Sequence, residues 1–165
     1  MASAEIIGAA IGILLMMIVA YLLVGSTLTA AEIVTTAQKD VTLQNEARMR
    51  TSIIIFNPTV NTAADPSFIN FYLNNTGSEP ISDFSHMDIF TSYLNAPGYQ
   101  RYTYNTGGAV WTWKYDTINP DLIHPQVLDP GEVMYICVTY PFSNPKPNWT
   151  LVSTANGVYT SATVP

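Results

Sequence analysis

The sequence has few cysteines, few charges and few basic residues, and each scarcity excludes something. Cys137 is the only cysteine, so no disulfide can form within one chain. Charged residues make up 11% of the 165 residues, with six Lys or Arg against twelve Asp or Glu. Binding of nucleic acid needs a clustered basic face. We therefore predict no nucleic-acid partner.

Motifs of catalysis and of metal binding are also missing. The chain has no G-x-S-x-G, no P-loop and no dinucleotide fingerprint. The two histidines, His86 and His124, lie in separate turn-like contexts, without a C-x-x-C or H-x-x-x-H spacing. Asp65, Asp83 and Asp88 are scattered, which favours a solvated surface over a calcium site. The sequence predicts no enzyme activity, no cofactor and no metal site.

A long apolar run near the start is the strongest positive signal. Residues 6–31 carry no charge and lie between Glu5 and Glu32. As a helix, this run would be about 39 Å long at 1.5 Å per residue. A bilayer core of roughly 30 Å needs about 20 apolar residues, so the run predicts a membrane-spanning helix. It is not typical of a removable signal peptide, because no Lys or Arg precedes it and its apolar core is long.

The flanking charges leave the orientation of this helix open. The positive-inside rule expects Lys or Arg beside the cytoplasmic end, and the first basic residue after the run is Lys39. Taken alone, that favours a cytoplasmic C-terminal domain. A basic leader removed before Met1 would reverse the orientation.

The helix is predicted to continue beyond the apolar run. No Pro or Gly occurs from Ala30 to Arg50, and Ile33, Ala37 and Val41 recur on one face. We predict one continuous helix through residue 50, amphipathic in its second half. The domains expected are this helix, 1–50, and an extracellular β-sandwich domain, 51–165.

Three residues at the head of the helix are candidates for assembly. Gly8 and Gly12 form a G-x-x-x-G spacing, which lets a second helix approach closely, although glycine is also tolerated in membrane helices. Glu5 lies where the helix dipole favours negative charge. It serves either as a simple acid of the first turn or as the partner of a neighbouring subunit's α-amine.

Short strands separated by turns are expected after residue 50. The predicted strands are 52–56, stopped by Asn57-Pro58, and then 68–73, 87–94, 99–104, 109–115, 133–140, 150–154 and 158–164. Strands 99–104 and 109–115 flank Thr106-Gly107-Gly108 and predict one hairpin, and Asn156-Gly157 predicts a two-residue hairpin. The fold class is therefore α+β, with a long N-terminal helix followed by an antiparallel β-sandwich or small barrel.

Three other features of this domain carry expectations. Asn74 and Asn148 head N-glycosylation sequons. Cys137 lies in the apolar run 133–140, which predicts a buried, inert thiol. An aromatic group either forms a cross-strand ladder that stabilises a hairpin or offers a platform for a ligand. Its members are Tyr99, Tyr102, Tyr104, Trp111, Trp113 and Tyr115.

The N-terminal segment and two short motifs resemble the archaeal branch of the type IV pilin superfamily. The chain begins Met1-Ala2-Ser3-Ala4-Glu5 and continues IIGAAIGILLMMIVAYLLVGSTL. Residues 71–77, FYLNNTG, resemble that branch's strand and "NTG" turn, and residues 128–132, LDPGE, resemble its "L-x-P-G-E" lead into a core strand. The resemblance is to archaellins and to the archaellum accessory proteins F and G. It implies an archaeal surface filament, and in pilins a leader is removed and residue 5 is often Glu.

Three functions remain open on the sequence. The leading one is a structural, non-enzymatic subunit of an archaellum or pilus-like filament, assembling through the helix into a helical homopolymer with the β domain outward. Such a subunit would be membrane-anchored before assembly and extracellular afterwards. The second is a membrane-anchored accessory or stator protein that binds the surface layer. The third is a membrane-tethered glycan-binding module that uses the aromatic group.

Overall fold

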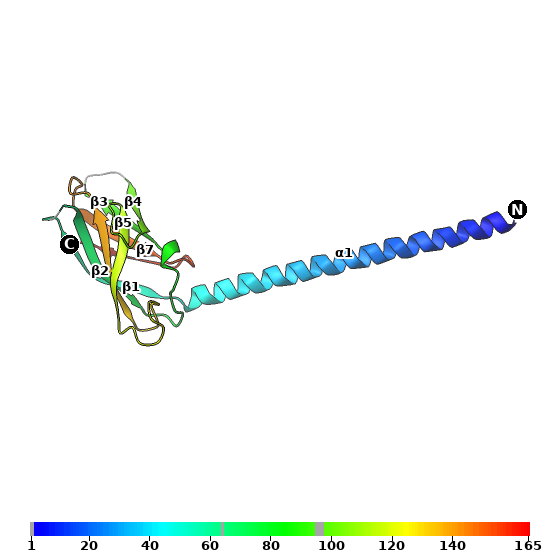
Figure 1. Cartoon of the computed structure of the whole chain (residues 1–165), viewed down its shortest axis with the longest axis horizontal. Helices are drawn as coiled ribbons and strands as arrows, with labels where there is room; N and C mark the ends of the chain where they lie inside the picture. The colour runs from blue at the N-terminus through cyan, green and yellow to red at the C-terminus, as the bar shows by residue number, and fades with distance from the viewer. Residues whose placement is uncertain (1, 64, 95–97) are drawn as a thin grey trace. The chain divides into compact units, whose positions relative to one another are not determined.

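The computed structural model describes residues 2–63, 65–94 and 98–165, and it divides them between one long helix and a β domain (Figure 1). The helix, α1, runs from Ala2 to Arg50 without a break. Its 49 residues give a length of about 74 Å at 1.5 Å per residue. The prediction of one continuous helix through residue 50 is therefore confirmed. The contacts group residues 1–44 as one compact unit and residues 45–165 as another.

The hydroxyl side chains of α1 bond to the helix's own backbone. Ser26 and Thr27 donate to carbonyl oxygens three residues earlier, and Thr29, Thr35 and Thr36 donate to carbonyls four residues earlier, at 2.8–3.0 Å. The hydrogen-bonding needs of these hydroxyls are therefore met within the helix itself. The helix forms although threonine has a low helix propensity.

Eight strands follow, and one short 3-10 helix (η1) interrupts them. Their bounds are β1 Ile53–Asn61, β2 Ser67–Asn75, η1 Phe84–His86, β3 Asp88–Tyr93, β4 Tyr99–Tyr104, β5 Thr112–Asn119, β6 Val133–Tyr140, β7 Pro147–Ser153 and β8 Tyr159–Thr163. Their order in the sheet is β1-β2-β6-β5-β4-β3-β7-β8. Between β2 and η1, Ile81 makes an isolated antiparallel bridge to Leu128.

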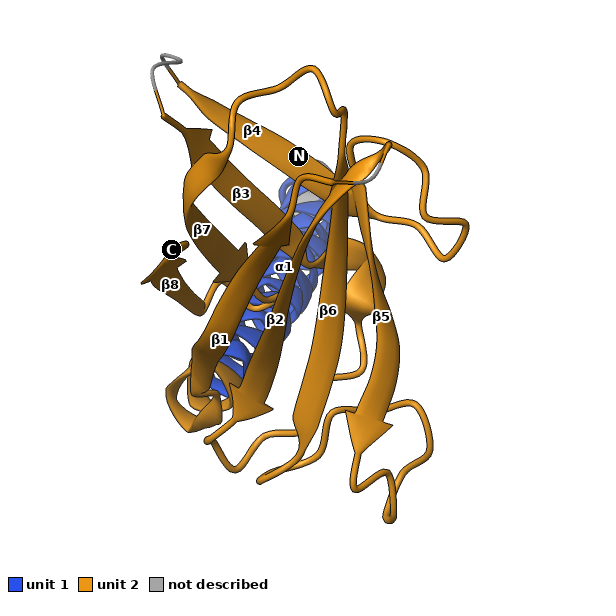
Figure 2. Cartoon of the chain, turned by 90° about the vertical axis from the view of Figure 1, so that its left-hand side faces the viewer, with its two compact units in different colours: residues 1–44 blue, residues 45–165 orange. Residues whose placement is uncertain are grey.

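The strands form two layers that nearly close into a barrel (Figure 2). One layer contains β1, β2, β6 and β5, and the other contains β4, β3, β7 and β8. The two edge strands, β1 and β8, lie close together. All pairings are antiparallel except that of β4 with β5. The predicted α+β class with an antiparallel sandwich or small barrel is confirmed.

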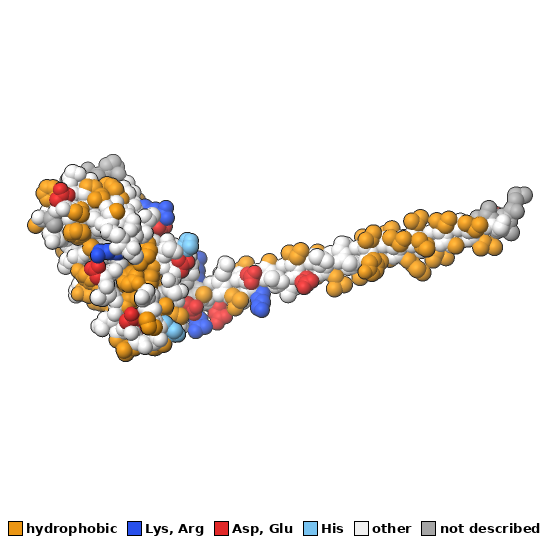
Figure 3. Space-filling model, viewed as in Figure 1, with side chains coloured by type: hydrophobic (Ala, Val, Ile, Leu, Met, Phe, Trp, Pro, Cys, Tyr) orange, Lys and Arg blue, Asp and Glu red, His pale blue; other side chains and the backbone are white. Residues whose placement is uncertain are grey.

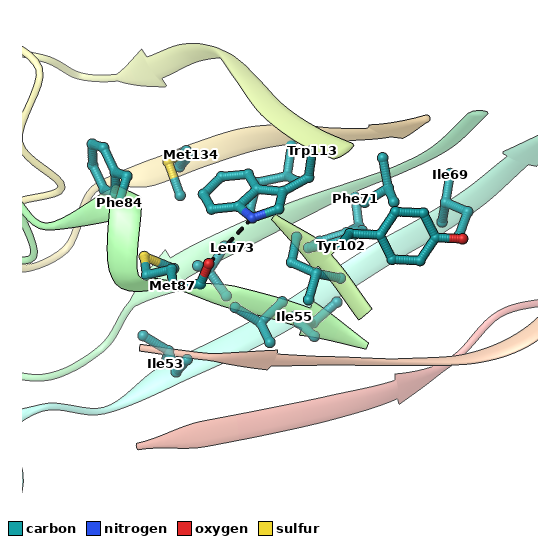
Figure 4. Close-up of a cluster of buried hydrophobic side chains, with 14 of the residues drawn as sticks. Ile53, Ile55, Ile69, Phe71, Leu73, Phe84, Met87, Tyr102, Trp113 and Met134 are labelled. Atoms are coloured by element: carbon teal, nitrogen blue, oxygen red, sulfur yellow. Dashed lines mark hydrogen bonds between the residues drawn. The ribbon is translucent and has the colours of Figure 1, made fainter. Parts of the chain in front are cut away.

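The core lies between the layers and is built by the alternation of the strands (Figure 4). In β2, Ile69, Phe71 and Leu73 point inward and have no exposed surface. Trp113 of β5 lies at the centre, and its indole Nε1 donates to the backbone carbonyl of Met87 at 3.3 Å. The strand β6, which matches the predicted strand 133–140, lies between β2 and β5.

Three local predictions within this domain are wrong. The first strand does not stop at Asn57-Pro58 but continues to Asn61, because a bulge absorbs both residues. Asn57 takes a φ of 50°, which asparagine tolerates better than most residues. Pro58 has no amide hydrogen to donate, and this costs little because β1 is an edge strand with a bulge at this point. The β7–β8 hairpin exists, but its connection is residues 154–158 rather than two residues.

The third wrong prediction is the hairpin around Thr106-Gly107-Gly108. Strands β4 and β5 meet in parallel, and at only two residue pairs. Two turns connect them: the backbone carbonyl and side-chain oxygen of Asn105 accept from the amides of Gly108 and Gly107, and the amide of Thr112 then donates to the carbonyl of Ala109. Strand β4 then pairs with β3 and β5 with β6, because each buries its inner face against a different layer.

Candidate assembly surfaces

Among the residues that the structure describes, the large side chains of the apolar run of α1 are exposed (Figure 3). Every large hydrophobic side chain from Ile6 to Leu28 is exposed, from 48% at Ile18 to 80% at Tyr21. No side of this stretch is polar, and a helix that is apolar all round is normally buried in lipid or among other helices. By length and composition, α1 is able to cross a membrane. This surface is the largest candidate site of the molecule.

The three assembly candidates lie on this exposed surface. Glu5 is in the first turn of α1 and is exposed. Gly8 and Gly12 lie one turn apart, and a Cβ added at either would meet nothing within 4 Å. The helix is therefore open to close approach at both glycines. Their role in assembly stays a prediction.

The last turn of α1 is fastened directly to the β domain, with no linker. Thr51, only 6% exposed, donates through Oγ1 to the carbonyl of Ala47 at 2.8 Å. The side chain of Asn156, from the β7–β8 connection, donates to the same Oγ1 at 2.6 Å. One buried hydroxyl thus joins the end of the helix to a turn far along the chain.

The "NTG" turn is the second fastening, which sequence reasoning interpreted only as a turn. The amides of Thr76 and Gly77 donate to the carbonyl of Ser52 at 2.8 and 3.0 Å. A Cβ on Gly77 would collide with the carbonyl oxygen of Arg50. Asn75 is fully buried and donates to the carbonyls of Glu79 and Leu128 at 2.8 and 2.9 Å. The motif therefore ties the helix end to the segment before β6.

The "L-x-P-G-E" motif leads directly into β6 and carries two buried acids. Its carboxylates, Asp129 and Glu132, are 2% and 4% exposed. Asp129 accepts from the backbone amide of His124 at 3.0 Å, and its other oxygen lies 3.0 Å from His124 Nδ1. Glu132 accepts from the amides of Asp129 and Leu122 at 3.1 and 3.4 Å. These two buried acids fix the loop 120–128 that precedes β6.

The two sequons lie in different surroundings. Asn148 is exposed on β7, where its Oδ1 accepts from the hydroxyl of Ser92 at 2.8 Å. Asn74 is half-buried in β2, between two paired strands, and its enclosed Oδ1 has no hydrogen-bond partner among the described residues. Asn148 is therefore the more accessible of the two asparagines.

The aromatic group does not form a platform. Trp113 and Tyr102 are fully buried, and the hydroxyl of Tyr102 is hydrogen-bonded to that of Tyr93. Tyr104 contacts Trp113 with ring centroids 4.9 Å apart. Tyr99 and Trp111 are exposed but pack on different rings, Trp149 and Tyr102. The group is thus divided between buried core rings and separate exposed rings.

The remaining polar candidates are used locally. His86 Nδ1 lies 2.7 Å from Asp83, and hydrogen bonds from Ser85 and His86 hold the pKa of that carboxyl below its usual value. Asp88 pairs with Arg101 at 2.8 Å. Across residues 2–63, 65–94 and 98–165, no three His, Cys, Asp or Glu side chains gather where they could hold a metal ion.

Cys137 is buried in β6, as predicted. It is 8% exposed, and burial raises the pKa of its thiol. A raised pKa leaves less thiolate at neutral pH, so the thiol is poorly nucleophilic.

A long apolar helix followed by a β-sandwich domain defines the class of this chain by its architecture. A sequence model of that class, described as archaeal-type flagellin, matches residues 2–164. The chain therefore belongs to the archaeal-type flagellin family, whose members are structural proteins of the archaellum and not enzymes.

Solved structures give further likenesses. The archaeal flagellum of Methanospirillum hungatei strain JF1 matches with a TM-score of 0.62 and 17% identity, over 95% of this chain and 90% of that one. It shows that the two chains share a fold. The archaellum periplasmic stator protein FlaG from Sulfolobus acidocaldarius matches at a TM-score of 0.48 and 20% identity, over 68% of this chain and 98% of that one. The archaellum periplasmic stator protein complex of FlaF and FlaG from the same organism matches with a TM-score of 0.44 and 19% identity, over 67% of this chain and 90% of that one. No curated protein matches the chain.

Proposed function

We propose that this chain is a filament-forming subunit of an archaellum or a related archaeal surface filament. In this proposal the apolar run of α1 first lies in the membrane and then packs against copies of itself. The β domain faces outward, outside the cell. The observation that carries the proposal is the apolar run, exposed on every side. Burial of such a surface is worth roughly 25 cal/mol per Å².

Two further observations support this role. The end of α1 is fastened to the β domain by Thr51, Asn156 and the "NTG" turn, which suits a rigid filament better than a flexible tether. The archaeal flagellum of Methanospirillum hungatei shares the fold over nearly the whole chain. Copies joined by a contact that does not close on itself would form an open helical fibre.

The test is electron microscopy of filaments sheared from the source cells, with mass spectrometry of their subunits. We expect this chain to be the bulk component of the filaments. If the filaments lack it and it stays with detergent-extracted membranes, the subunit role fails, and an anchored accessory role that binds the surface layer takes its place.

We also propose that Asn148, and not Asn74, carries a glycan when the domain is extracellular. The support is the exposure of Asn148 and the enclosed position of Asn74 in the sheet. Intact-mass measurement of the purified subunit tests this. The Asn148→Gln variant should lose the mass of one glycan, and Asn74→Gln should keep it. A glycan that survives in Asn148→Gln and disappears in Asn74→Gln would contradict the assignment.

A further inference from the structure

Two adjacent aliphatic side chains protrude from the β domain. Leu122 and Ile123 are 79% and 69% exposed, the highest values among the large aliphatic side chains described in residues 51–165. Exposed apolar residues are common singly, and here two consecutive ones are exposed in the connection between β5 and β6. We call this pair the Leu122–Ile123 knob.

The knob is held out by hydrogen bonds on both sides. The amide of Leu122 donates to Glu132, and the amide of His124 donates to Asp129. Asp121 accepts from the amide of Gln126 at 3.1 Å. Burial of two carboxylates is costly unless hydrogen bonds compensate it. The domain therefore keeps two buried acids whose bonds fix an exposed apolar tip, and a preorganised tip loses little entropy when it binds.

The knob's loop lies at the end of the sandwich where the helix enters. Leu128, at the base of the loop, pairs with Ile81 and accepts from Asn75, and Gly131 donates to the carbonyl of Asn75. Asn75 ends β2 and begins the "NTG" turn, whose next two amides donate to the carbonyl of Ser52. In an assembly of parallel stalks, this end of a domain would face the stalks of its neighbours.

The second half of α1 offers a matching hollow. Val34, Ala37, Gln38 and Val41 line one open hollow, together with Thr42. The first four are spaced i, i+3, i+4 and i+7, the four positions that form a hole for an inserted side chain in helix packing. Val34 and Val41 are 54% and 57% exposed, although they lie beyond the uncharged run. We call these four residues the Val34 hollow.

Charge complementarity orients the two surfaces. Asp121, beside the knob, is exposed and forms no ion pair among the residues that the structure describes. Arg48 is likewise exposed and unpaired within that part of the chain. It lies seven residues after Val41, and so on the same helix face by the helical period. The exposed aspartate next to the knob and the exposed arginine about two helical turns (about 10 Å) beyond the hollow therefore carry opposite charges.

We infer that the Leu122–Ile123 knob of one copy inserts into the Val34 hollow of a second copy, with Asp121 facing the second copy's Arg48. Each copy carries both a knob and a hollow, so the contact is heterologous and continues from copy to copy. The inference rests on the proposed filament role. It adds a contact between a β domain and a neighbouring stalk to the packing of the apolar runs.

Cysteine cross-linking in the full chain tests the inference. Two differently tagged chains, one with Ala37→Cys and one with Ile123→Cys, are expressed together, both with Cys137→Ala. After mild oxidation of filaments or membranes, we expect a disulfide dimer that carries both tags. Tyr159→Cys is the matched control, because Tyr159 is 67% exposed but lies on β8, and it should give no dimer with Ala37→Cys.

The outcomes separate the inference from the proposed function. If filaments form and no dimer with both tags appears, the inference is wrong while the filament role stands. A dimer of two Ile123→Cys chains, or a cross-link to a different protein, also overturns it. If the chain stays in membranes and forms no filaments, the filament role is wrong. A dimer with both tags in those membranes would still support the knob contact, and the absence of that dimer would contradict it.

A charge variant gives a second readout. Arg48→Glu should lower the yield of the dimer with both tags, because it places a negative charge opposite Asp121. Lys39→Glu makes the same change on another helix face and should leave the yield unchanged. Equal effects of the two variants would contradict the proposed orientation.

Discussion

At the residue scale, a few small or buried groups decide how the chain holds together. Thr51 and Asn156 join the helix to the domain through one hydroxyl group. The side chain of Asn75, buried at the end of β2, donates hydrogen bonds to the carbonyls of Glu79 and Leu128. None of these residues has a catalytic role, and each acts by satisfying backbone or hydroxyl groups that would otherwise be buried without a partner.

Gly77 should be the least replaceable glycine of the chain. In Gly77→Ala the new Cβ would collide with backbone atoms of Arg50 and Ser52, which cannot move away as a flexible side chain would. Overpacking of this kind costs about 1–3 kcal/mol. Denaturant unfolding of the full chain in detergent measures the loss. The control is Gly25→Ala, where a Cβ meets nothing within 4 Å, and a similar loss in that variant would contradict the explanation.

Cys137 should react slowly with alkylating reagents. Burial raises the pKa of its thiol, and only the thiolate reacts. We expect slow labelling by iodoacetamide in the folded chain at pH 8 and fast labelling in denaturant, measured by mass spectrometry. The raised pKa also stabilises the folded state below the ordinary thiol pKa of about 8.5, and this contribution is lost as the pH rises through the folded-state value. Equal labelling rates in both states would contradict a buried thiol.

At the scale of elements, the sequence predicted what depends on periodicity and missed what depends on partners. The helix and the strand 133–140 follow from unbroken apolar patterns, and both are present. The β4–β5 hairpin failed because a Gly-Gly turn says nothing about which layer each strand joins. The sequence did not predict the hydrogen bonds of Asn75 or the burial of the two acids that bind the 120–128 loop. Polar residues in turns are usually solvated, and only the fold shows which backbone groups lie next to them.

The head of α1 carries the next prediction. If helices approach closely at Gly8 and Gly12, leucine there would force the backbones apart. We expect Gly8→Leu and Gly12→Leu each to weaken assembly by about 1–3 kcal/mol, roughly 5- to 150-fold in an association constant. The amount of polymer in sheared fractions measures this. Gly25→Leu is the matched control, since Gly25 lies outside the G-x-x-x-G spacing. A normal amount of polymer from both variants would mean that these glycines are merely tolerated in a membrane helix and are not needed for assembly.

At the scale of the whole molecule, the chain combines two parts with opposite solvent requirements. The β domain buries its own core, with Trp113, Phe71 and Ile136 fully enclosed. The large side chains of the apolar run, by contrast, are exposed in the part of the chain that the structure describes. A molecule of this kind is not complete as a single copy in water, because its largest apolar surface needs lipid or other copies.

Removal of the apolar run should therefore separate the two requirements. We expect a chain lacking residues 2–31 to stay soluble without detergent, to sediment as a monomer and to unfold cooperatively, because the core and the fastening at Thr51 remain. It should also be absent from filaments formed by the intact chain. Analytical ultracentrifugation and thermal unfolding measure these properties, with the intact chain in detergent as the control. A shortened chain that still enters filaments would place the main assembly contacts in the β domain and its remaining helix, and would overturn the role given to the apolar run.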